Sequence, residues 1–316
     1  AMHGAVIEHV GLAGTRVFDE VEKLGSRLEK MNEILGSTVP SEAAVVFDWE
    51  NWWSIDALQG PNELLDYKSE CINYYRAFFE NHIPVDVIGL EDDLSKYKLV
   101  VAPMLFMASK DYAEKIKDYV RNGGTYVATA MTGYVDKNYL FYQGGYPGPF
   151  KELFGLWVEE QDALAPEAPN HFEWNGQEYE AQLICDQIRP LSELKKLIEQ
   201  NKKELGDLAY FKSPAYQISE EAGDMTDDGT YTEDFYKGRP VITENAFGTG
   251  RVYYIGTQST PDFYKSFMSE VTKKAGVKPA AENVEEGVEV AVRENENGRF
   301  LFYLDHKNNR VEIKKA

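Results

Sequence analysis

The fold of this 316-residue chain is decided by the apolar stretch Ala43-Ala44-Val45-Val46-Phe47 and by the segments that follow it. A short, unbroken apolar run between polar residues predicts a strand that is buried on both faces. Similar runs then alternate with amphipathic helical segments. The predicted order is helix 64–81, strand 85–88, strand 98–102, helix 110–121 and strand 125–129.

Apolar strands that alternate with helices are typical of a parallel sheet covered by helices on both faces. The order of the segments favours the α/β class, with an open, doubly wound sheet of flavodoxin-like type. Ligand sites in such sheets lie beyond the carboxyl ends of the strands. The residues directly after Phe47 are therefore the first candidates for a functional site.

The rest of the chain has a less regular pattern. Residues 144–239 are predicted to be mostly irregular, including a solvated acidic loop at 220–234. A small antiparallel β domain is predicted at the carboxyl end, beyond Pro279. The other predicted elements are a helix at 14–35, strands near 172–185, a helix near 191–205, a hairpin at 241–256, a helix at 261–275, and short strands at 288–293, 300–304 and 310–313.

Composition excludes several classes of partner. The chain carries 53 acidic and 33 basic residues, a formal net charge of −20, which repels nucleic acids and anionic membranes. Its two cysteines, Cys71 and Cys185, give no disulfide framework and no metal-ligand spacing. The amino-terminal residues lack the pattern of a signal peptide. We therefore expect a cytoplasmic protein without a metal or another cofactor.

Several short motifs share their order along the chain with a known family. They lie at 3–9, 15–18, 45–53, 74–77, 83–87, 99–103, 234–236, 238–240 and 248–257. Together they resemble the family 42 glycoside hydrolases, which are β-galactosidases, from the end of the catalytic barrel through the trimerisation domain. The resemblance implies a remnant of the barrel at 1–40, an amidotransferase-like α/β trimerisation domain at 41–279, and a truncated β domain at 280–316.

The resemblance also implies what this chain does not do alone. The family hydrolyses terminal β-D-galactosides with retention, using two glutamates of a barrel. A barrel of that kind needs about 250 residues, and only some 40 precede the strand at 43–47. No glutamate here matches either catalytic position. We expect an inactive homotrimerisation module that meets its β-galactoside substrate only within the full enzyme.

The cluster Asp48-Trp49-Glu50-Asn51-Trp52-Trp53 is the main candidate site. Aromatic faces stack on sugars while carboxylates and amides bind hydroxyl groups, so the cluster suits a stand-alone carbohydrate-binding module. Tryptophans are also enriched at subunit interfaces. The predicted roles are therefore packing in an interface or core, lining the approach to a neighbouring subunit's active site, or independent sugar binding.

An amidotransferase-like hydrolase is the third class of function. Its nucleophile would be a cysteine on a tight turn after a strand, but the comparable turn, Ala128 to Gly133, contains none. Cys71 and Cys185 are predicted to be packing residues, and nothing positions His171 as a base. Gly248-Thr249-Gly250 is predicted to form a hairpin turn rather than a phosphate-binding loop, and the acidic residues near Asp227 lack the spacing of a calcium loop.

Overall fold

The computed structural model describes residue 9 and residues 12–206, 208–219 and 222–316. They form two compact units, one of Ser41–Pro279 and one that combines Ala1–Pro40 with Ala280–Ala316. Most of the motif at 3–9 lies outside the described residues. No helix in the described part of the chain is long and apolar enough to cross a membrane.

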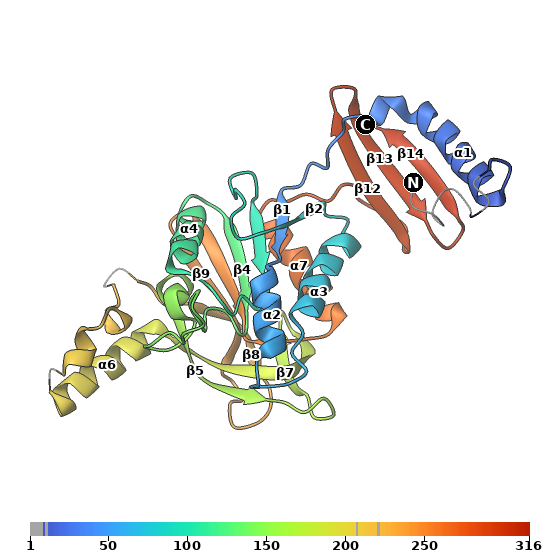
Figure 1. Ribbon diagram of the computed structural model, residues 1–316. Helices are drawn as coiled ribbons and strands as arrows, with labels where there is room; N and C mark the ends of the chain where they lie inside the picture. Colours follow the sequence, from blue (N-terminus) through green and yellow to red (C-terminus); the bar gives the residue numbers. More distant parts are fainter. Residues whose placement is uncertain (1–8, 10–11, 207, 220–221) are drawn as a thin grey trace. The chain divides into compact units, whose positions relative to one another are not determined.

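The unit of Ser41–Pro279 is built on one eleven-stranded sheet, and half of that sheet is parallel (Figure 1). The parallel strands stand in the order β2-β1-β3-β4-β10, with neighbours in parallel register throughout. Every residue of β1, β3 and β4 is buried, as their apolar sequences predict. The bounds are β1 Ala43–Val46, β2 Val85–Ile88, β3 Leu99–Ala102, β4 Thr125–Thr129 and β10 Gly250–Ile255.

The other half of the sheet is antiparallel, and it comes largely from the region predicted to be irregular. It continues from β10 in the order β9-β8-β6-β7-β11, and β5 pairs with β7. The expectation of a solvated loop at 220–234 is wrong for β8, where the Trp174 indole donates to the Asp228 carboxylate (2.9 Å). The bounds are β5 Leu156–Ala163, β6 Asn170–Trp174, β7 Gln177–Pro190, β8 Thr226–Tyr231, β9 Pro240–Phe247 and β11 Thr257–Gln258.

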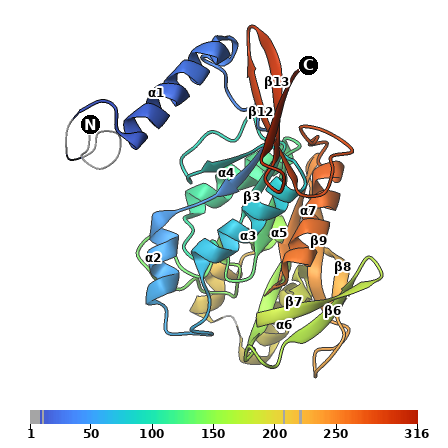
Figure 2. The same ribbon diagram turned by 90° about the vertical axis from the view of Figure 1, so that its right-hand side faces the viewer.

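Successive residues of the parallel strands enter different hydrophobic clusters, so helices cover both faces of this half of the sheet. Val45 and Val101 belong to the cluster that includes residues of α3 and α7, whereas Val46 and Val100 pack with residues of α4 and α5. Figure 2 shows α3 and α7 on the near side of the sheet. The helices are α2 Trp49–Ala57, α3 Tyr67–Glu80, α4 Lys110–Arg121, α5 Lys151–Phe154, α6 Leu191–Leu205 and α7 Pro261–Lys274, with 3₁₀ turns η2 Gly148–Phe150, η3 Ala209–Lys212 and η4 Pro214–Tyr216.

The second unit contains one helical segment and a three-stranded antiparallel sheet. The predicted single helix at 14–35 is wrong in its second half, where α1 gives way to a 3₁₀ segment and Met31 is non-helical. None of these helical residues is buried, so no packing holds a long regular helix there. Arg293 ties the following segment to the sheet through the Ser37 carbonyl (2.6 Å). The bounds are α1 Arg16–Leu28, η1 Glu29–Ile34, β12 Val288–Asn295, β13 Gly298–Asp305 and β14 Arg310–Lys315.

Candidate subunit-interface site

The residues after β1 form a helix, which the sequence analysis did not predict. Asp48 is the N-cap of α2, and its carboxylate accepts hydrogen bonds from the backbone N–H and the side-chain amide of Asn51 (2.9 Å each). Aspartate is among the best N-cap residues because it satisfies an N–H group that the helix leaves free. The pattern of an aspartate followed by the tryptophans of a first turn was the available signal for this helix.

Asn51 joins this helix to the loop that follows β3. Its side chain is fully buried, donates to the Met107 carbonyl (3.0 Å) and accepts from the Met107 N–H (2.7 Å). All the hydrogen-bonding atoms of this amide therefore have protein partners. Asp48 and Asn51, predicted as possible sugar-binding residues, serve here to hold α2 against the carboxyl edge of the sheet.

The three tryptophans of α2 lie close together, but Trp52 is more deeply buried than Trp49 and Trp53. The ring centroid of Trp49 is 5.4 Å from that of Trp52 and 6.3 Å from that of Trp53. Trp52 is half-buried against the core, and the Lys68 ammonium lies 5.4 Å from its ring centroid. Trp49 and Trp53 remain 57% and 61% exposed. Two large indoles on a rigid helix thus face away from the core.

Tyr139 adds a third exposed ring from another part of the chain. Its hydroxyl donates to the Ser54 carbonyl of α2 (3.0 Å), and its ring is 40% exposed. The Asp136 carboxylate accepts the N–H groups of Asn138 and Leu140, and these backbone hydrogen bonds lower the pKa of Asp136. We call Trp49, Trp53 and Tyr139 the aromatic patch. No local pattern predicted a role for Tyr139, because only folding brings its loop to α2.

The two carboxylates of the cluster have different surroundings in this structure. Asp48 caps α2, while Glu50 is exposed on its first turn. Retaining hydrolysis needs two carboxyl groups about 5 Å apart across a bound sugar. Among the described residues, no group of three or more His, Cys, Asp and Glu is arranged to hold a metal ion.

The two cysteines have the environment of packing residues. Cys71 in α3 is 5% exposed and Cys185 in β7 is fully buried. Burial raises the pKa of Cys71 to about 12 and that of Cys185 to about 11, whereas a nucleophilic cysteine needs a lowered pKa and access to solvent. The His171 ring lies 3.0 Å from the Glu233 carboxylate. These thiols do not support amidotransferase-like chemistry.

The turn after β4 is where a strand-to-helix elbow would present a nucleophile. Its left-handed position is occupied by Met131, with a φ of 68° and 1% exposure. Gly133 follows with a φ of 70°, and a Cβ there would lie 2.9 Å from the Pro147 carbonyl oxygen. This turn is not followed by a helix, since the next helical element is η2, and its left-handed residue is a buried methionine rather than a nucleophile.

Comparison with known proteins places this α/β unit among assembly domains of carbohydrate-active enzymes. The model of the β-galactosidase trimerisation domain matches residues 41–215 and 191–278. The chain belongs to this family, the trimerisation domain of family 42 glycoside hydrolases.

Named relatives and solved structures agree with this assignment. The chain is 38% identical to the β-galactosidase Pbg of Clostridium perfringens over 98% of its own length and 42% of that protein, and 37% identical to LacZ of Lactobacillus acidophilus over 97% and 41%. It matches the crystal structure of the β-galactosidase from Bacillus circulans sp. alkalophilus with a TM-score of 0.80 and 35% identity, covering 96% of this chain and 41% of that one. The chain thus spans about two fifths of the length of these relatives.

Proposed function

We propose that this chain is the trimerisation module of a β-galactosidase and that the aromatic patch is part of the contact between its copies. The observation that carries this proposal is the exposure of Trp49 and Trp53 on α2. This helix is held in place by hydrogen bonds of the Asp48 cap and of the buried Asn51 amide. Large indoles held rigidly in water are typical of the centres of protein interfaces. Three copies of one chain form a closed ring, which limits assembly to a finite size.

The position of the patch suits a second role in the full enzyme. Trp49 and Trp53 follow β1, and Tyr139 follows β4, so the patch lies at the carboxyl edge of the parallel strands. We propose that the patch lines the approach to a neighbouring subunit's active site. Glu50 and Trp52 border it on the same helix. Hydrolysis of terminal β-D-galactosides would belong to the longer protein, with no catalytic residue from this chain.

Three finer assignments accompany this proposal. Residues 1–40 would be the end of a catalytic barrel and residues 280–316 the start of a β domain. The strand order β2-β1-β3-β4-β10 supports a flavodoxin-like, amidotransferase-like relationship for the parallel half of the sheet. The two unpaired cysteines favour a cytoplasmic location.

Light scattering behind a sizing column tests the proposed assembly. We expect a species of three times the chain mass of 35.9 kDa. Trp49→Ala and Trp53→Ala should each weaken association by about 2 kcal/mol, or roughly thirtyfold, as buried interface tryptophans do. The shift should appear as dissociation on dilution.

Phe235→Ala is the matched control, because Phe235 is 65% exposed but lies outside the patch. It should leave the mass unchanged. A monomer at all concentrations would contradict the proposal that this chain is sufficient for assembly. Saturable quenching of tryptophan fluorescence by lactose in the unaltered chain would favour the alternative, a carbohydrate-binding module.

A further inference from the structure

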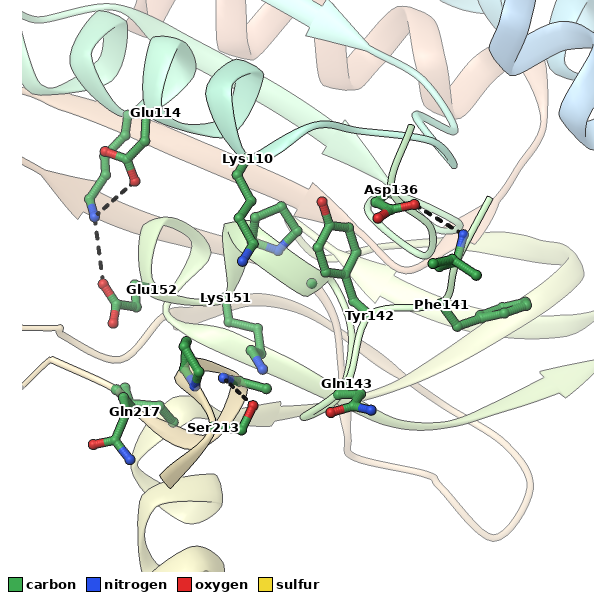
Figure 3. Close-up of a pocket in the computed structure, with 17 residues that line it drawn as sticks. Lys110, Glu114, Asp136, Phe141, Tyr142, Gln143, Lys151, Glu152, Ser213 and Gln217 are labelled. Carbon is green, nitrogen blue, oxygen red and sulfur yellow. Dashed lines mark hydrogen bonds and ion pairs between the residues drawn. The ribbon is translucent and has the colours of Figure 1, made fainter. Parts of the chain in front are cut away.

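A groove of about 710 Å³ lies between α4, the loop 136–143, α5 and the segment 213–218 (Figure 3). Its volume is in the range of sites that bind small molecules. The groove is lined mainly by polar side chains, and it uses none of the three residues of the aromatic patch. It therefore calls for an explanation separate from assembly.

Lys151, the first residue of α5, is the unusual group in this groove. It is 7% exposed, and its ammonium donates to the Gly144 carbonyl. An ammonium group has three donors, and the Lys151 ammonium makes no other hydrogen bond or ion pair within the described part of the chain. Burial lowers the pKa of Lys151 to about 8, although Glu152 opposes this shift. A buried cation without a paired anion is costly, so a ligand that supplied one would be stabilised.

Lys110 brings a second positive charge to the same space. Lys110 and Lys151 both line the groove, Lys110 from α4 and Lys151 from α5 (Figure 3). Lys110 is exposed and makes no side-chain hydrogen bond or ion pair with any described residue. It is also the first residue of the twelve-residue α4, whose amino end carries partial positive charge.

The carboxylates that line the groove all have other partners. Lys117 lies 3.7 Å from Glu114 and 3.6 Å from Glu152, so these three residues form their own ion-pair group. Asp136 accepts the backbone N–H groups of its loop. None of these carboxylates is within ion-pair distance of Lys110 or Lys151. Two of the amines that line the groove, those of Lys110 and Lys151, thus have no ion-pair partner among the described residues.

We propose that this groove, lined by Lys110 and Lys151, binds a small ligand bearing an oxyanion, a carboxylate or a phosphate group. An oxyanion supplies both the negative charge and the acceptors that these amines lack, and charge-assisted hydrogen bonds are the strongest of their kind. Gln143 and Gln217 also line the groove, and the Gln217 amide donates to the Phe211 carbonyl (2.8 Å), which leaves its oxygen as an acceptor.

Calorimetric titration of the chain with inorganic phosphate, against sodium chloride of equal ionic strength, tests the site. The unaltered chain should bind phosphate saturably. Lys110→Ala and Lys151→Met should each weaken binding by about tenfold or more, the usual effect of losing a charge-assisted bond. Because Lys110 is exposed, its variant should retain the fold even if Lys151→Met does not.

Lys137→Ala is the matched control, since it removes an exposed lysine of the neighbouring loop that does not line the groove. Its affinity for phosphate should equal that of the unaltered chain. Phosphate should also raise the pKa of Lys151, measured by NMR of lysine labelled with ¹³C at Cε. Absence of saturable binding, equal loss in all three variants, or an unchanged Lys151 pKa would each overturn the proposal.

Discussion

The buried carboxyl of Glu70 shows how much a single residue of this protein depends on its surroundings. Glu70 lies in α3, is 2% exposed, and accepts hydrogen bonds from the Tyr264 hydroxyl of α7 (2.7 and 2.9 Å). Burial raises its pKa to about 7, although the hydrogen bonds from Tyr264 and Asn73 oppose the shift. The carboxyl therefore joins α3 to α7, and its raised pKa makes the stability of the protein depend on pH.

The sign of this dependence follows from the raised pKa. Between the ordinary value of 4.5 and about 7, the folded protein binds this proton more tightly than the unfolded chain does. The free energy of unfolding must then fall as pH rises through this window. Burial also raises the pKa of Asp186, to about 6, so the two carboxyls act in the same direction.

We predict that Glu70→Gln stabilises the protein above pH 7. Glutamine keeps an acceptor for Tyr264 and removes the charge, and a shift from 4.5 to about 7 corresponds to roughly 3 kcal/mol at pH 8. Urea unfolding at a series of pH values measures the difference. At pH 5, where Glu70 is protonated in the folded protein, the variant and the original should have similar free energies of unfolding. A difference that is independent of pH would disprove the assignment.

At the scale of elements, the β9–β10 hairpin is held against the end of α4 by two glycines. Gly248 has a φ of 61°, which suits a residue without a side chain. A Cβ at Gly250 would collide with the carbonyl oxygens of Val120 and Gly124. The hairpin turn predicted at Gly248-Thr249-Gly250 is confirmed, and the reason for its second glycine is this contact with the backbone.

Gly250→Ala should therefore destabilise the sheet by about 1–3 kcal/mol, the usual cost of forcing an extra carbon into a packed site. Backbone atoms cannot move aside as cheaply as a flexible side chain. Gly25→Ala is the control, because nothing lies within 4 Å of a Cβ there and alanine favours the helix. Equal thermal stability of the two variants would show that the hairpin does not pack as described.

At the scale of the molecule, the large hydrophobic clusters belong to one unit, although Val292 and Phe300 are buried in the other. All three hydrophobic clusters are formed by residues between Ala43 and Val277. In the other unit the described residues form no cluster of this kind, and β14 is exposed along its whole length. Three strands are about the minimum for a stable sheet. The two units should differ in stability.

We predict that a fragment of residues 41–279 folds alone and unfolds in one cooperative transition. In calorimetry the full chain should show this transition together with a smaller one at lower temperature, from the unit of Ala1–Pro40 and Ala280–Ala316. A fragment that lacks near-ultraviolet circular dichroism or unfolds gradually would show that the core needs the rest of the chain.

Local sequence patterns predicted the parallel half of the sheet correctly. The strands at 85–88 and 125–129 and the helix at 110–121 were predicted within a residue or two, because buried strands and amphipathic helices leave their period in the sequence. The family was also recognisable from short motifs in order, and the match to the trimerisation domain confirms it. Within residues 144–239, the helix near 191–205 and the strands near 172–185 are confirmed as α6, β6 and β7. The strands β5 and β8 were not predicted, since strands such as β8 take their form from cross-strand partners far along the chain.

The sequence by itself determined the class of fold, the family and the cluster of tryptophans after β1, because these depend on composition and on short-range order. Only the tertiary structure decided which of those residues face solvent. The tertiary structure buried Asn51 against Met107, brought Tyr139 to α2, and placed Lys110 and Lys151 in the lining of one groove. Each of these pairs joins residues separated by tens of positions, and no local period records such a contact.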